Sequence, residues 1–136
     1  MTKRFVLFLL GFVVAALANA AQTLRVLAWP GYADADLVQA FEQQFDVRVE
    51  VTLVASDEVL AQKLGVNRGG DFDVVAANTV EIKRYIGKKW LQPLAQANIP
   101  NIARQLPRFQ NARAIAGITH LGEVYAVPYT FAEMGL

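Results

Sequence analysis

The sequence predicts an α/β fold in which helices cover a parallel sheet, and three observations carry that prediction. Strand-like and helix-like stretches alternate from residue 24 to residue 87. The strand-like stretches are short and rich in Val, Leu and Ala, as in strands buried within a sheet. The helix-like stretches repeat apolar residues every four positions and begin at capping residues. This order implies parallel strands joined by right-handed crossovers, with helices on both faces.

We expect the first twenty residues to lie outside the folded domain, because they have the pattern of a secretory signal peptide. Lys3 and Arg4 form a positive start, residues 5–17 are apolar apart from Gly11, and Ala18-Asn19-Ala20 matches a small-x-small cleavage site. The apolar run is shorter than the ~20 residues that span a bilayer. We therefore expect cleavage after Ala20, a periplasmic location, and a mature α/β lobe over residues 21–136.

The composition argues against several classes of function. The chain of 136 residues has no cysteine, one histidine and a formal net charge of +1. Without Lys3 and Arg4, 11 basic side chains face 12 acidic ones, so the mature net charge is −1 and no basic stripe indicates nucleic acid. No hydrolase nucleophile motif or zinc-ligand set is present. We expect no enzyme activity, no cofactor and no metal.

The first strand is predicted over residues 24–29 and the first helix after Asp34, a favourable N-cap residue. In that helix Leu37, Phe41 and Phe45 form one apolar stripe.

The second strand is predicted over residues 47–54, where apolar and polar residues alternate. Ser56 is the expected N-cap of the second helix, Leu60 and Leu64 its buried face, and Gly65 its end.

The third strand, residues 72–77, is apolar enough to be buried on both faces. Asn78 or Thr79 can cap a third helix that buries Ile82 and Ile86.

The pattern weakens after residue 90. A short helix broken at Pro107 is predicted within residues 102–109. A last strand is predicted over residues 123–129, which Pro128 confines to an edge or an end.

Ligands of such sheets bind outside the carboxyl ends of the strands, here residues 29–32, 55–56 and 77–79. Trp29-Pro30-Gly31-Tyr32 has the residues of a type II turn, which would hold two aromatic side chains beside a short loop. They could stack on a ligand or hold an ammonium group. Alternatively, Trp29 packs into the core and Tyr32 packs on the next helix.

Asn78 and Thr79 place amide, hydroxyl and helix-start N–H groups together, which suits a polar ligand head. The alternative is simple helix capping. The two interpretations are compatible, because capping residues on this edge also face a ligand site.

Four segments resemble, in order, the first lobe of bacterial periplasmic solute-binding proteins of ABC importers, in particular the spermidine/putrescine-binding branch. They are LRVLAWPGYAD, SDEVLAQKL, DFDVVAANTVEIKRYIGKKWLQPL and GEVYAVPYTF. The resemblance covers most of residues 24–136, with residues 95–120 the least similar. It implies two α/β lobes that close on a small solute, here a polyamine or related organic cation, and deliver it to an inner-membrane ABC permease, with no catalysis. A monomer is implied for the full-length protein.

The resemblance also implies site residues. Trp29 and Tyr32 match aromatic residues of the amine-binding cleft, Asn78 and Thr79 lie at the next polar loop, and Tyr129 lies where the chain approaches the hinge. The chain departs from the polyamine pattern at two positions. Gly31 stands where an acidic residue is common, and Val80 stands where a cleft tyrosine is common.

Members of this family are more than twice as long as this chain, so we interpret it as an incomplete protein whose second lobe is missing. The sequence is also compatible with a different class of protein, in which the same lobe is the ligand-binding sensor domain of a membrane receptor or regulator.

Overall fold

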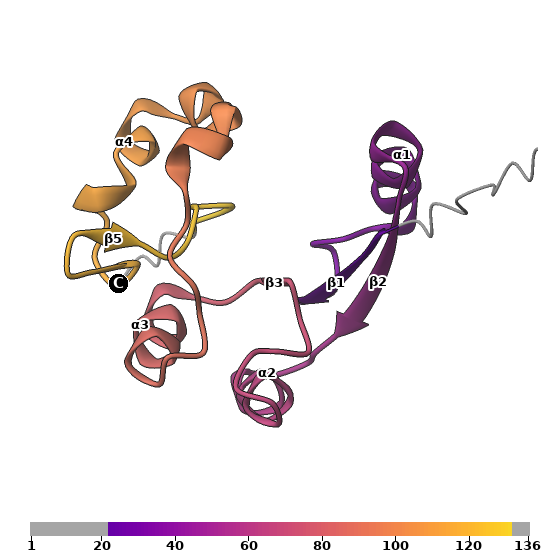
Figure 1. The fold of residues 1–136 in the computed structure, drawn as a ribbon, viewed down its shortest axis with the longest axis horizontal. Helices are drawn as coiled ribbons and strands as arrows, with labels where there is room; N and C mark the ends of the chain where they lie inside the picture. The colour runs from indigo at the N-terminus through magenta and orange to yellow at the C-terminus, as the bar shows by residue number, and fades with distance from the viewer. Residues whose placement is uncertain (1–21, 132–136) are drawn as a thin grey trace, which may run out of the picture.

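The computed structural model describes residues 22–131, so the predicted signal peptide lies outside the described residues. Its three-stranded parallel sheet has the order β2-β1-β3, which confirms the predicted fold class (Figure 1). No helix within residues 22–131 is long and apolar enough to cross a membrane. The elements are β1 (Gln22–Ala28), α1 (Ala35–Phe45), β2 (Val47–Leu53), α2 (Asp57–Gly65), β3 (Val74–Val75), α3 (Thr79–Gly87), η1 (Gln96–Asn98), η2 (Pro100–Arg104), α4 (Pro107–Gln110), η3 (Ala112–Ala114), β4 (Thr119–His120) and β5 (Glu123–Val124).

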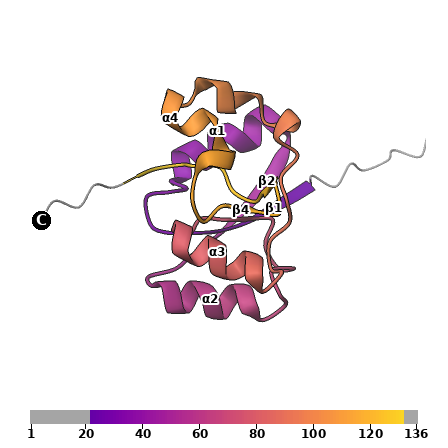
Figure 2. The same cartoon turned by 90° about the vertical axis from the view of Figure 1, so that its left-hand side faces the viewer.

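The core of the sheet side lies between β1 and two helices. Leu27, Val54, Leu60, Leu64 and Tyr85 form one buried cluster. It confirms the buried face predicted for α2, and it places α2 and α3 side by side (Figure 2). Ser56 also caps α2 as predicted, because its hydroxyl accepts a hydrogen bond from the Val59 N–H at 3.3 Å.

Helix α3 joins this core to a second one. Ile82 and Ile86 pack with Ala112, Ile118 and Val124 in a separate buried cluster. This second cluster supports the short turns and the β4–β5 hairpin, which lie across the molecule from α1 in Figure 1. The predicted burial of both isoleucines is confirmed.

One predicted length is wrong in this half of the chain. Only Glu123–Val124 of the predicted last strand pairs, with Thr119–His120, so the strand ends before Pro128. The predicted break of the helical segment at Pro107 is confirmed, since η2 ends at Arg104 and α4 begins at Pro107. Proline at the first position starts a helix more readily than it continues one.

The third strand is also shorter and more open than predicted. It pairs with β1 through Val26↔Val74 and Leu27↔Val75, and Val74 is 47 % exposed. Val74 lies on the same face of the sheet as Val26, the face on which α1 packs against β2 rather than β3. Burial of β3 on both faces is therefore a wrong prediction.

The apolar stripe of α1 is largely uncovered. Leu37, Phe41 and Phe45 are 60 %, 41 % and 54 % exposed, and α1 has no buried residue. Phe41 and Phe45 line a groove of about 320 Å³ together with Leu24 and Val47 of the sheet. Parallel sheets are normally covered on both faces, so this face has room for a further layer.

Candidate functional site

The carboxyl ends of the three parallel strands meet at one edge, as predicted. The Val54 N–H donates to the Ala28 carbonyl at 3.0 Å, and the Ala76 N–H donates to the Leu27 carbonyl at 2.9 Å. The loops that follow the strands therefore start side by side. We call the loop residues 29–32, 55–56 and 77–79 the rim.

The first rim loop is a tight turn. The Tyr32 N–H donates to the Trp29 carbonyl at 3.2 Å, and Gly31 has a φ of +83°. A type II turn requires a positive φ at its third residue, which glycine adopts without steric cost. The turn predicted from Trp29-Pro30-Gly31-Tyr32 is therefore present, and it separates two aromatic side chains by a short stretch of backbone.

The two aromatic residues of this turn have different surroundings. Trp29 is half-buried and packs against the cluster formed by Leu27, Val54, Leu60, Leu64 and Tyr85. Tyr32 is 38 % exposed, and its ring lies 5.1 Å from the ring of Tyr129, with the planes tilted by 50°. Trp29 thus supports the core, while Tyr32 and Tyr129 form an open aromatic pair that we call the tyrosine pair.

The tyrosine pair joins residues that are far apart in the sequence. Tyr129 is 70 % exposed and follows Pro128, well beyond the last paired strand. Tilted rings at this separation attract each other and leave ring surface open to solvent. Among the five site residues predicted from the sequence, these two make a ring-to-ring contact across a long stretch of chain.

Asn78 is a helix cap, as one interpretation of the sequence predicted. Its Oδ1 accepts hydrogen bonds from the N–H groups of Val80 and Glu81 at 3.1 and 3.0 Å. The first N–H groups of α3 are thus satisfied within the chain. Thr79 is exposed at the first position of the same helix.

The other end of the Asn78 amide binds a residue that no sequence motif indicates. Its Nδ2 donates to both carboxylate oxygens of Asp57, at 3.2 and 3.1 Å. Asp57 is the first residue of α2, so this contact links the second and third rim loops. Nothing in the spacing of 21 residues indicates the pair; only the shared position after neighbouring strands brings the two side chains together.

The first turn of α2, directly after the second rim loop, is acidic. Asp57 and Glu58 occupy the first turn of that helix. The Ser56 hydroxyl holds the pKa of the Glu58 carboxyl below its ordinary value. Carboxylates at this position provide negative charge that favours a positively charged ligand.

The described residues include no group of three or more His, Cys, Asp or Glu side chains that could hold a metal ion. The side chains that this part of the chain presents are open aromatic rings, an amide fixed by hydrogen bonds, and carboxylates. Aromatic rings can stack on a ligand, and carboxylates can accept hydrogen bonds from a cation.

Comparison with known proteins gives the relatives of this chain. No family model matches it. It is 27 % identical to the putrescine-binding periplasmic protein PotF of Escherichia coli over 94 % of this chain and 34 % of that protein. It is 27 % identical to the putrescine-binding periplasmic protein SpuD of Pseudomonas aeruginosa, over 100 % of this chain and 38 % of that protein. The chain thus spans about a third of the length of these relatives.

Two solved structures share the fold. A putative spermidine/putrescine ABC transporter protein from Listeria monocytogenes matches 65 % of this chain and 27 % of its own, with a TM-score of 0.61 and 27 % identity. The spermidine/putrescine substrate-binding protein PotD of Streptococcus pneumoniae matches 71 % of this chain and 30 % of its own, with a TM-score of 0.61 and 24 % identity. The chain is therefore a distant homologue of part of the periplasmic putrescine- and spermidine-binding proteins of ABC transporters.

Proposed function

We propose that the chain is the N-terminal part of a periplasmic solute-binding protein that captures a small organic cation, a polyamine or a relative of one, and delivers it to an inner-membrane ABC permease. The tyrosine pair is the observation that carries this proposal. It lies at the carboxyl-end edge of a parallel sheet, where ligands of such folds bind. The names of the homologous binding proteins support the same class of ligand.

The proposed ligand contacts are Tyr32 and Tyr129, with Asn78 and Thr79 on the same rim. Aromatic faces attract ammonium groups, by about 0.5–1 kcal/mol at exposed sites and by more when the site is closed from water. An open pair on one lobe therefore binds weakly. A second lobe that closes over the pair strengthens the attraction, and binding and release need no bond-making chemistry.

The uncovered face of α1 supports the proposal that residues 21–136 are one part of a longer protein. Leu37, Phe41 and Phe45 are exposed, and Phe41 and Phe45 line a groove with Leu24 and Val47 of the sheet. In the complete protein we expect further chain to cover it. A signal peptide over residues 1–20 belongs to the same proposal, because it would deliver the protein to the periplasm.

Thermal unfolding of the complete protein tests the proposed function. We expect putrescine and spermidine to raise the melting temperature, and butane-1,4-diol, which has the length of putrescine without its charges, to leave it unchanged. Ligand at about 100 times its dissociation constant stabilises by about 2.7 kcal/mol. The proposal fails if no amine raises the melting temperature at millimolar concentration.

A pair of variants assigns the effect to the tyrosine pair. Tyr32→Ala should remove most of the amine-induced shift, because it deletes one ring of the pair. Phe45→Ala is the matched control, since Phe45 is an exposed aromatic residue at the far end of α1 from the rim loop. Equal ligand shifts in both variants would place the ligand elsewhere.

A further inference from the structure

The position of the Tyr129 ring is not set by burial. The side chain is 70 % exposed. The Tyr125 N–H donates to the Ile118 carbonyl at 2.9 Å, but the described residues after Tyr125 belong to no strand. Pro128 has no N–H to donate. The backbone that carries the tyrosine is therefore open to support by side chains from another part of the chain.

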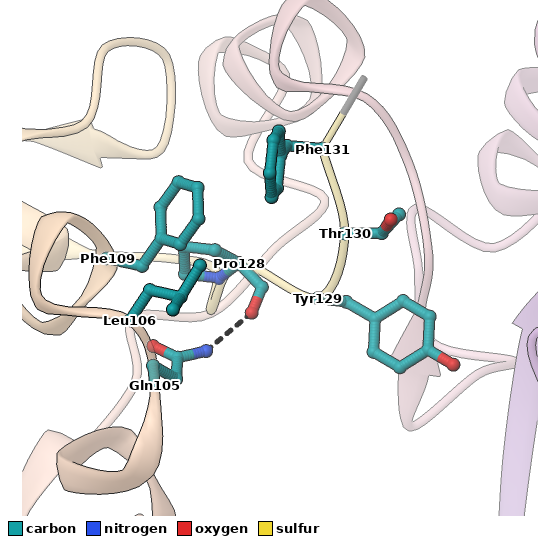
Figure 3. Close-up of a pocket in the computed structure, with 7 residues that line it drawn as sticks. All are labelled: Gln105, Leu106, Phe109, Pro128, Tyr129, Thr130 and Phe131. Carbon is teal, nitrogen blue, oxygen red and sulfur yellow. Dashed lines mark hydrogen bonds between the residues drawn. The ribbon is translucent and has the colours of Figure 1, made fainter. Parts of the chain in front are cut away.

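Gln105 supplies one such contact. Its Nε2 donates to the Pro128 carbonyl oxygen at 2.6 Å (Figure 3). The carbonyl only accepts, so the nitrogen of the amide must face it. That carbonyl belongs to the planar peptide unit that joins Pro128 to Tyr129. Fixing the carbonyl direction therefore fixes the direction in which the chain enters Tyr129.

A second contact holds the chain on the other side of the tyrosine. The ring of Phe131 lies 5.4 Å from the ring of Phe109, and the Arg108 guanidinium lies 4.2 and 4.9 Å from the two ring centroids, respectively. Tyr129 is thus bracketed by contacts at Pro128 and Phe131. In Figure 3 its ring points away from Gln105 and Phe109.

The space under this segment is not filled. A hollow of about 170 Å³ lies among Leu106, Phe109, Pro128 and Phe131. Incomplete packing offers few van der Waals neighbours that could replace a missing hydrogen bond. The Gln105 amide therefore carries a large share of the support for the segment that leads to Tyr129.

Gln105 is itself held in place. Its backbone N–H donates to the Ile102 carbonyl at 3.1 Å, and its backbone carbonyl accepts from Gln110 Nε2 at 2.9 Å. The residue lies between η2 and α4, the part of the chain in which the family resemblance is weakest.

We propose that Gln105 is a positioning residue: its amide holds the Pro128–Tyr129 peptide so that the Tyr129 ring meets Tyr32 at the rim. The proposal rests on the function proposed above, because it makes affinity for the cation depend on a side chain that does not touch it.

Gln105→Met tests this, since methionine keeps the length of the side chain and has no donor. Gln92→Met is the matched control, because it makes the same change at an exposed glutamine that lies outside the segment of residues 105–131. We expect the nuclear Overhauser effects between the Tyr32 and Tyr129 rings to disappear in Gln105→Met and to remain in Gln92→Met. Putrescine binding by the complete protein should weaken about fivefold in Gln105→Met alone.

The two measurements distinguish failure of this inference from failure of the proposed function. Ring-to-ring Overhauser effects that persist in Gln105→Met, or that vanish equally in Gln92→Met, overturn the positioning role. If these effects disappear in Gln105→Met while putrescine affinity is unchanged, the positioning role stands and the tyrosine pair is refuted as the ligand site. Equal melting temperatures of the two variants confirm that a general loss of stability is not the cause.

Discussion

Replacing Asn78 with Ala removes the cap of α3 and the contact between two rim loops at once. The capping oxygen satisfies the N–H groups of Val80 and Glu81, and the amide nitrogen holds Asp57. Loss of a side-chain cap costs about 1 kcal/mol, within a range of about 0.5–2 kcal/mol. The exposed bond to Asp57 adds less than about 1 kcal/mol.

The expected total is about 1–2 kcal/mol, which lowers the melting temperature of a domain of this size by about 4–8 °C. Thermal unfolding followed by circular dichroism measures it. Asn78→Ser should keep most of the stability, because its hydroxyl can still cap the helix. Thr79→Ala, at the exposed neighbouring position, should change stability by less than about 0.5 kcal/mol. An Asn78→Ala variant as stable as Thr79→Ala would refute the capping role.

Three further predictions concern the fold. Leu121 is 90 % exposed and has a φ of +50° before Gly122, a backbone conformation that is strained for leucine. Leu121→Asn creates the favoured Asn-Gly hairpin turn and should raise the free energy of unfolding by about 0.5–1 kcal/mol in urea titrations. A destabilised variant would contradict the backbone strain at Leu121. In the chain of 136 residues, Leu37→Gln should change stability by less than about 0.5 kcal/mol because Leu37 is 60 % exposed, whereas Leu60→Ala, at a fully buried position, should cost about 2–5 kcal/mol; equal costs would show that other parts of this chain cover α1. Burial raises the pKa of Tyr85 to about 12, so its contribution to stability is complete below the ordinary value of 10.0 and is lost as the pH rises from 10.0 to about 12. Tyr85→Phe should flatten the stability profile over that pH interval, and an unchanged profile would refute the assignment.

The order of the strands and the position of the rim could be predicted from the sequence because they follow from local patterns. Alternating apolar residues locate β2, capping residues locate the starts of α2 and α3, and parallel topology brings the strand ends together. The turn at residues 29–32 was also predictable, because proline and glycine restrict it to one backbone shape.

The surroundings of individual side chains could not be predicted in the same way. The stripe of Leu37, Phe41 and Phe45 has the spacing of a buried face, but burial depends on which other elements cover it. Likewise, the sequence left Trp29 equally suited to the core or to a ligand wall, and only the packing of distant residues places it against the core.

Long-range contacts could not be predicted from the spacing of residues in the sequence. The contacts of Tyr32 with Tyr129, Asn78 with Asp57, and Gln105 with Pro128 join segments from different loops. Each contact depends on the positions of loops outside the regular strands, and the periodicity of the sequence does not indicate those positions.

The central claim is that the tyrosine pair is one wall of a site for an organic cation. Titration of the complete protein with putrescine, followed through the ring signals of Tyr32 and Tyr129 by NMR, tests it most directly. We expect the signals of both rings to shift saturably with one shared dissociation constant, and butane-1,4-diol to shift neither. Saturable binding of putrescine that leaves both rings unshifted, or no binding at millimolar concentration, would contradict it.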